Sequence, residues 1–167
     1  MFSPRDLQLA RKAKRAGANY SLRIILEARR AELPISLAFA LVEKESGFRN
    51  IFGCDDGSIL CHKPVTHARV LQLLHHVQGG GVSNGVGLTQ LTWPGYIRLA
   101  EREGGAHKER VQLKVGFSVL RGHILAHGER RGLASYNAGD PWSPAGQRYA
   151  TQVEVLQSKW HRILTAR

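Results

Sequence analysis

The stretch LVEKESGFRN, residues 41–50, lies at the end of a helix that is apolar for eight residues, then carries two glutamates and stops. Pro34 opens this helix at a position where a missing N–H costs nothing. Residues 35–42 are apolar on almost every side, which is typical of a helix buried all round. We therefore predict a central buried helix that ends at Ser46 and Gly47.

The two glutamates of this stretch are predicted to point in different directions. Residues three or four apart share a helix face, so Glu45 continues the apolar stripe of Leu41 and Val42, whereas Glu43 points roughly 200° away from Glu45. A carboxylate at the end of an apolar stripe loses hydration, which raises its pKa, as a general acid working near neutral pH requires. From the spacing alone, the commoner alternative is a solvated charge at a helix end.

The chain as a whole is predicted to be mainly α, with one small β-hairpin. Apolar periodicity and capping signals place further helices at residues 5–16, 20–32, 66–78, 94–103, 109–127, 130–136 and 145–164. The segment VGLTQLTW, residues 86–93, carries the strand or hairpin signal, because β-branched and apolar residues stand beside glycines. There is no repeat, low-complexity tract or linker, so we expect a single domain over residues 1–167.

Charge is the most unusual bulk property of the chain. Its 24 Lys and Arg against 13 Asp and Glu give a net charge of +11, and no apolar run is long enough to span a bilayer. A polyanionic partner is favoured, and both nucleic acid and an anionic bacterial cell wall meet that description. The charged, amphipathic N-terminus does not resemble a secretory signal, so we expect synthesis in the cytoplasm.

The cysteines and histidines raise the question of a disulfide or a metal. For the two cysteines we expect free thiols in a reducing compartment, with a disulfide as the alternative. Two groups could bind a metal by composition: Cys54, Cys61, His62 and His67, and the helical pair His123 and His127. Neither group has a recognised ligand spacing, so we predict no metal and no other cofactor.

Four short blocks stand in a fixed order along the chain: ESGF (45–48), GLTQL (87–91), SYNAG (135–139) and RYATQV (148–153). In this order and spacing they resemble the signatures of the lytic transglycosylase and goose-type lysozyme superfamily. The resemblance is greatest to the muramidase domains of endolysins from phages of actinobacteria, and it covers about residues 34–160. It implies a lysozyme-like fold of the goose-type or transglycosylase kind and cleavage of the glycan of peptidoglycan.

By this resemblance Glu45 is the catalytic acid. It would protonate the glycosidic oxygen between N-acetylmuramic acid and N-acetylglucosamine as an oxocarbenium-like transition state forms. It would then act as a base, either on the muramoyl 6-hydroxyl, giving a 1,6-anhydro product, or on water. An inverting hydrolysis needs a second carboxylate, for which Asp55 and Asp56 are the candidates, with a simple turn in CDDGS as the alternative.

The blocks also supply the predicted substrate-binding residues Ser46, Gln90, Tyr136, Asn137 and Tyr149. By resemblance, Gln90 would bond sugar hydroxyls or N-acetyl groups, and Tyr136 and Asn137 would offer an aromatic face and an amide. Tyr149 would hydrogen-bond Glu45 and hold its orientation. The alternatives are helix termination for Ser46 and simple packing for Tyr149.

Two residues depart from the family pattern: Thr89 stands where Met is usual, and Ser135 where Ala is usual. Residues 54–84 are also a longer insertion than compact transglycosylases have.

The resemblance implies glycan strands of peptidoglycan as the substrate and, for an endolysin, release through a holin-type pore. The basic surface would hold the enzyme on the anionic wall, and we expect no nucleic acid. The alternatives are a basic nucleic-acid-binding protein and a virion-associated component that binds or penetrates the wall.

Overall fold

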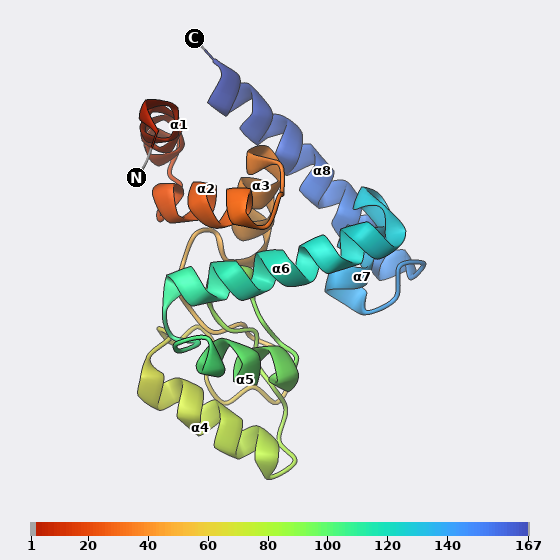
Figure 1. Cartoon of the computed structure of the whole chain (residues 1–167). Coiled ribbons are helices and arrows are strands. Elements are labelled where there is room, and N and C mark those ends of the chain that lie inside the picture. Colours follow the sequence, from red (N-terminus) through yellow and green to blue (C-terminus); the bar gives the residue numbers. More distant parts are fainter. Residues whose placement is uncertain (1–2, 167) are drawn as a thin grey trace. The chain divides into compact units, whose positions relative to one another are not determined.

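The computed structural model describes residues 3–166, and over these residues it is mainly helical, with 66% of the chain in helices. The helices are α1 (Pro4–Arg15), α2 (Ser21–Arg30), α3 (Ile35–Ser46), α4 (His67–Gln78), α5 (Pro94–Arg102), α6 (Glu109–His127), α7 (Glu129–Ala138) and α8 (Pro144–Thr165), with the 3-10 turn η1 (Gly87–Thr89) between α4 and α5 (Figure 1). The predicted helices are confirmed, with small shifts at their ends. No helix of the described part is both long and apolar enough to cross a membrane.

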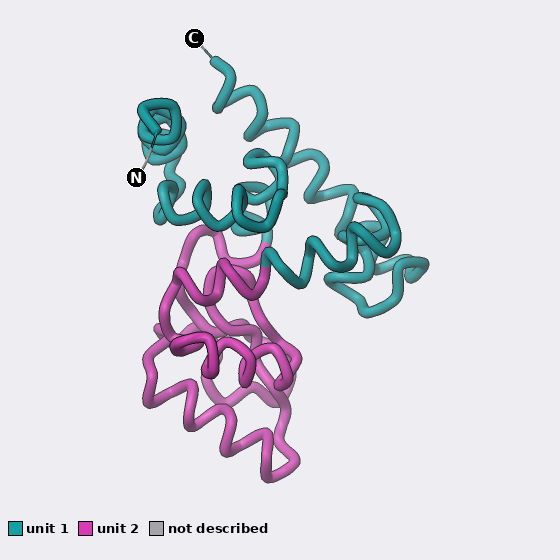
Figure 2. The backbone as a smooth tube through the Cα atoms, viewed as in Figure 1, with its two compact units in different colours: residues 1–44, 117–167 teal, residues 45–116 magenta. Residues whose placement is uncertain are grey.

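The described chain divides into two compact units (Figure 2). Unit 1 runs to Lys44 and resumes at Phe117, and unit 2 is Glu45–Gly116. Both boundaries fall inside helices, the first in α3 and the second in α6. The expected single domain over residues 1–167 stays a prediction, and residues 1, 2 and 167 lie outside the described residues.

The core of unit 1 is built around α3, whose residues 37–42 are completely buried, as the apolar sequence predicts. Phe39 of this helix stacks on Trp160 of α8, with ring centroids 4.8 Å apart. Helix α1 packs on α2 and α8, and α7 packs on α8. The start of α1 is fixed by a capping box between Ser3 and Asp6, and the Asp6 carboxylate also pairs with Arg29 of α2 at 2.7 Å.

The predicted hairpin in unit 2 is not confirmed, because no strand is found among residues 3–166. The backbone at Gly87 has a φ of +71° and that at Gln90 a φ of +47°, so the chain turns at both positions instead of running extended. Val86 and Leu91 exchange two backbone hydrogen bonds of 3.1 and 3.2 Å across the resulting loop. The β structure in the described chain is limited to isolated bridges, Ile51 with Pro64 and Phe52 with Val86.

Candidate active site

Glu43 is held by α8 within unit 1. Its carboxylate accepts a hydrogen bond from Lys159 Nζ and another from Trp160 Nε1, both at 2.6 Å. The Trp160 ring is fully buried, and this bond gives its indole N–H a partner away from water. Glu43 therefore has a structural role, since its hydrogen bonds link α3 to α8.

Glu45 is half-buried in the last turn of α3, where unit 2 begins. The residues after this turn reverse the chain, since Gly47 and Phe48 have φ values of +57° and +60°. The Phe48 side chain is buried and anchors the reversal in unit 2. The predicted helix end is confirmed, and Glu45 is the last acidic residue before the chain turns.

Ser46 ties the end of α3 to the second block. Its hydroxyl donates a 3.0 Å hydrogen bond to the Leu88 carbonyl, and both residues are buried. Its carbonyl accepts bonds from the backbone N–H and the Nε of Arg49, both at 3.2 Å. These bonds give Ser46 a structural role as the residue that joins ESGF to GLTQL, and its substrate contact stays a prediction.

Gln90 is held inside its own loop. Its Nε2 donates to the carbonyls of Ile51 at 3.1 Å and Gly87 at 2.7 Å. A Cβ at Gly53 or at Gly85 would meet its Oε1 at 2.4 or 2.3 Å. The space left by these two glycines is therefore filled by the Gln90 side chain, which fixes the shape of the second block.

A buried glutamine on α6, Gln112, supports the second block and is missed by sequence analysis. Its Oε1 accepts from the Leu88 N–H at 3.0 Å, and its Nε2 donates to Asn50 Oδ1 and the Ala106 carbonyl at 2.9 and 2.8 Å. Thr89, which replaces the usual Met, donates its hydroxyl to the Gln112 carbonyl at 3.0 Å. This departure from the family pattern is therefore accommodated by a hydrogen bond in a fully buried position.

The third and fourth blocks lie on α7 and α8, which pack together in unit 1 (Figure 1). Tyr136 is half-buried and meets the His123 ring edge-on at 6.4 Å, while Asn137 is exposed near the end of α7. Tyr149 on α8 is buried, and Lys44 Nζ lies 5.9 Å from the centroid of its ring. The predicted substrate roles of these three residues stay predictions.

Ser135, the other departure from the family pattern, is paired with a histidine. Its hydroxyl lies 3.0 Å from His123 Nδ1, and burial, with a smaller effect of His127, lowers the pKa of His123. One turn earlier, Gly132 lets α7 approach α6 closely, since a Cβ there would lie 2.7 Å from Ile124 Cα. The serine in this block is therefore matched by a polar partner on α6.

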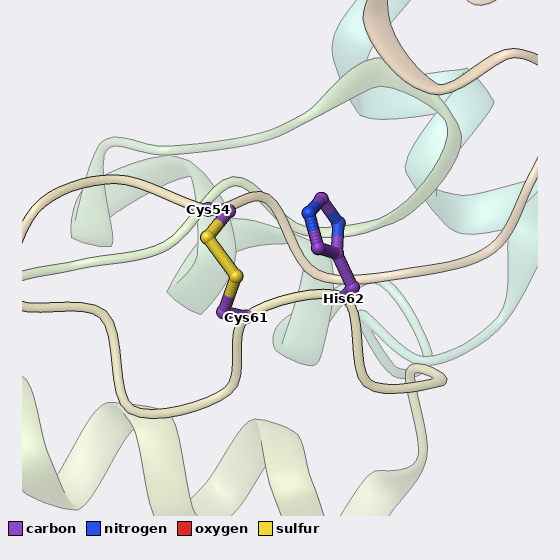
Figure 3. Close-up of side chains that lie close together, drawn as sticks. All are labelled: Cys54, Cys61 and His62. Carbon is purple, nitrogen blue, oxygen red and sulfur yellow. A yellow bond between two sulfur atoms is a disulfide. The ribbon is translucent and has the colours of Figure 1, made fainter.

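Asp55 and Asp56 are exposed in a turn that a disulfide between Cys54 and Cys61 closes (Figure 3). The backbone N–H of Asp55 donates to Ser58 Oγ, and its carbonyl accepts from the Ser58 N–H, both at 2.9 Å. Asp55 therefore takes part in a local turn of CDDGS, the alternative to a catalytic role, and the catalytic role of Asp55 or Asp56 stays a prediction. The expectation of two free thiols is wrong, because the turn brings the cysteine Cα atoms to 4.4 Å, within disulfide range.

Within residues 3–166, two clusters combine side chains that can bind a metal ion: Cys54 with Cys61 and His62, and His67 with Glu101 and His107. In the first cluster the two sulfur atoms are bonded to each other, so neither can act as a thiolate ligand (Figure 3). His67, which sequence analysis grouped with the cysteines, belongs to the second cluster.

Two exposed tryptophans follow the blocks closely and have no assigned role in the sequence analysis. Trp93, after the second block, is 63% exposed and meets Tyr96 edge-on at 4.9 Å. Trp142, after the third block, is 64% exposed, and the Arg131 guanidinium lies 3.9 Å from its ring centroid. Large exposed aromatic faces favour ligand contact, and the proximity of both residues to a block is the signal that could have found them.

Comparisons of the chain with models of known families, with curated proteins and with solved structures find no match. The family resemblance therefore rests on the four sequence blocks.

Proposed function

We propose that this protein is a muramidase, an enzyme that cleaves the β-1,4 bond between N-acetylmuramic acid and N-acetylglucosamine in peptidoglycan. The observation that carries the proposal is the environment of Glu45. It is a half-buried carboxylate in the last turn of a buried helix, directly before a serine that binds the second block. Partial removal from water favours the pKa that a general acid needs near neutral pH, and the loop that follows Glu45 is a place where a substrate could reach it.

The pairing of the blocks within each unit supports the proposal further. In unit 2 the hydroxyl of Ser46 in the first block binds the carbonyl of Leu88 in the second. In unit 1 the helices that carry the third and fourth blocks pack on each other. Consecutive helices commonly pack on each other, so the bond between Ser46 and Leu88, which are 42 residues apart in the chain, is the stronger of these two observations.

In the proposed reaction, Glu45 gives its proton to the glycosidic oxygen while the bond from that oxygen to C1 of the muramoyl residue breaks. The N-acetylglucosamine side leaves with a new hydroxyl, and the charge on C1 develops as an oxocarbenium-like centre. In transglycosylation the Glu45 carboxylate then removes the proton from the muramoyl 6-hydroxyl and so regains its own proton. In an inverting hydrolysis a second carboxylate removes the proton from the attacking water, and Glu45 is reprotonated from solvent.

The nucleophile separates the two versions of this proposal. Transglycosylation needs only Glu45, because the substrate supplies its own 6-hydroxyl. An inverting hydrolysis needs a second carboxylate to hold water, and Asp55 or Asp56 would have to do so from an exposed turn. The ends of the product strands therefore identify the route.

The finer assignments are part of the same proposal. The helices would form a lysozyme-like fold with α3 at its centre, and the protein would be a phage endolysin for host lysis, made in the host cytoplasm and released through a holin-type pore. Glycan strands would be the substrate, and the net charge of +11 would hold the enzyme on the anionic wall. Trp93 and Trp142 would offer aromatic faces to sugar rings.

The same charge favours one rival, a nucleic-acid-binding protein. Such a protein would bind DNA equally well with Glu45→Gln and would release nothing from cell walls. It leaves the four ordered blocks without an explanation.

The proposal is tested by measuring the soluble fragments that the protein releases from purified peptidoglycan. Glu45→Gln is expected to lower the rate by at least about a hundredfold, because the general acid is removed. Glu43→Gln, the same change two residues earlier on the same helix, is the matched control. Because it weakens the bonds to Lys159 and Trp160, both variants are compared at a temperature where they are fully folded, and Glu43→Gln is expected to keep the activity there. Equal release by the wild type and Glu45→Gln would overturn the assignment.

A further inference from the structure

We propose that His67, Glu101 and His107 form a binding site in unit 2 for a divalent transition-metal ion of the zinc type. The proposed wall-cleaving chemistry does not use this site. One ligand atom from each of the three side chains lies within 4.8 Å of the others. Two imidazoles and one carboxylate are a ligand set that zinc takes in proteins, with a fourth position left for water.

Three separate segments of unit 2 bring these side chains together. His67 is the first residue of α4, directly after the capping Thr66, and Glu101 lies in the last turn of α5. His107 belongs to the loop between α5 and α6. Helices α4 and α5 pack on each other, and His67 and Glu101 lie on these two helices. An ion bound here would cross-link all three segments.

The Glu101 carboxylate is already oriented for this task. Its Oε1 accepts a 2.7 Å hydrogen bond from the backbone N–H of Ala106, which holds the carboxylate against the loop that carries His107. Its Oε2 lies 3.9 Å from His67 Nδ1. One oxygen therefore fixes the position of the group, while the other faces the histidine. Metal-binding carboxylates are commonly supported by a hydrogen bond of this kind.

The His107 ring is fixed in place and has an unpaired nitrogen. Its Nδ1 is buried and has no hydrogen-bond partner among the described residues. Gly105, with a φ of +117°, lets the ring lie against the backbone, since a Cβ there would come within 2.8 Å of Nδ1. The His107 carbonyl accepts a 3.3 Å bond from Asn50, and its ring meets that of His67 edge-on at 5.0 Å. A buried nitrogen without a partner costs free energy, which coordination through this atom would recover.

A small movement would complete the site. Zinc ligands lie about 2.0–2.1 Å from the ion, so neighbouring ligand atoms in a tetrahedral site are roughly 3.4 Å apart. The cluster, whose ligand atoms lie within 4.8 Å of one another, must therefore contract by up to about 1.4 Å. The His67 side chain is 57% exposed and can contribute to this adjustment by rotating about its own bonds.

The test is a titration of the chelator-treated, full-length, oxidised protein with Zn²⁺, followed by isothermal calorimetry. We expect one site per chain and a higher melting temperature with Zn²⁺, because the ion binds the native state and not the unfolded chain. His67→Ala and Glu101→Gln are each expected to weaken binding by at least about tenfold and to reduce the shift in melting temperature. Glu101→Gln keeps an oxygen for the Ala106 N–H, so a loss of binding in that variant reports the ligand and not the fold.

His62→Ala is the matched control, since His62 is another exposed histidine of unit 2 and adjoins the disulfide cluster. It is expected to bind Zn²⁺ as tightly as the wild type. Co²⁺ gives a second readout, because a tetrahedral site with these ligands produces visible absorption bands that both variants should lose. Failure of the wild type to bind Zn²⁺, or equal binding by the wild type and both variants, would overturn the proposal. No cell-wall substrate is present, so the result is independent of the proposed muramidase activity.

Discussion

At the scale of single residues, Ser46 is the side chain that connects the proposed catalytic helix to the second block. Its hydroxyl bond to the Leu88 carbonyl lies in a buried environment, where a lost partner is not replaced by water. Loss of this bond would loosen the end of α3, and with it the residue directly before it, Glu45. Ser46 is therefore expected to matter to activity as a positioning residue.

Ser46→Ala is expected to lower the free energy of unfolding by about 1–2 kcal/mol. We also expect it to slow peptidoglycan release at temperatures where the variant is fully folded, with kcat falling more than the affinity for the wall. Ser36→Ala, on the same helix in a half-buried position, is the control for loss of a hydroxyl. It should change the free energy of unfolding and the rate of peptidoglycan release little. Unchanged stability and activity in Ser46→Ala would show that the bond does not position the helix end.

Helix geometry predicts that the two glutamates point in different directions, but the partners of Glu43 could not be predicted from the sequence. Helical spacing places Glu43 and Glu45 on different faces. The residues that bind Glu43 are Lys159 and Trp160, the first of them 116 residues further along the chain, and only the packing of α8 on α3 brings them there. The role of Gln112, the buried partner of the second block, could not be predicted from the sequence either. A glutamine in a helix more often faces solvent, and only the tertiary packing shows that this one is buried.

At the scale of elements, the start of α1 has an N-terminal capping box whose contribution to stability depends on pH through Asp6. The Ser3 hydroxyl, and after it Arg29, lower the pKa of Asp6 below its ordinary value of 3.8, while burial opposes them. The folded protein therefore binds a proton at Asp6 less readily than the unfolded chain does. The stability from this cap is fully present above the unfolded pKa and is lost as the pH falls through the lower, folded pKa.

The expected result is that Asp6→Asn destabilises the protein at pH 7 and that the difference from the wild type shrinks below about pH 4. Urea unfolding of both proteins between pH 3 and pH 7 measures this difference. A difference that stays constant over the whole range would mean that the Asp6 charge does not contribute to the cap.

The turn from Cys54 to Cys61 is a second element with a direct test. The disulfide closes a short loop, with a sequence separation of 7, and is expected to contribute about 2–3 kcal/mol at most. Replacing both cysteines with serine should therefore lower the melting temperature of the oxidised protein, and a reducing agent should have the same effect on the wild type but none on the variant. Equal melting of oxidised and reduced wild type would contradict the account.

The elements differ in how far the sequence predicts them. Helices with strong apolar periodicity and clear caps, such as α4 with Thr66 as its N-cap, are found where they are expected. The segment VGLTQLTW has the composition of a strand. In the structure Gly87–Thr89 form the 3-10 turn η1 instead, and Gln90 at its end takes a left-handed conformation that a glutamine rarely adopts. A local bond from the Gln90 side chain to the Gly87 carbonyl and a tertiary bond to the Ile51 carbonyl stabilise this conformation, and the tertiary bond cannot be predicted from local propensity.

At the scale of the whole molecule, the net charge and the four blocks suggest two different partners, and the proposed function accommodates both. The basic surface would concentrate the protein on an anionic wall, and the blocks would supply the chemistry on the glycan within it. The division into two compact units could not be predicted, since both boundaries fall inside continuous helices and no change in composition marks them. Sequence patterns signal linkers, but they do not signal boundaries of this kind.

The role of Glu45 as the catalytic acid is best tested by mass spectrometry of the fragments released from purified peptidoglycan by the wild type and by Glu45→Gln. We expect fragments with muramoyl ends from the wild type and at least about a hundredfold slower release from the variant. Anhydro-muramoyl ends would identify a transglycosylase, and reducing muramic ends a hydrolase, in which case Asp55 and Asp56 are the next residues to replace. Release of no fragments by the wild type, or of the same fragments at the same rate by both proteins, would contradict the assignment of Glu45 as the catalytic acid of a muramidase.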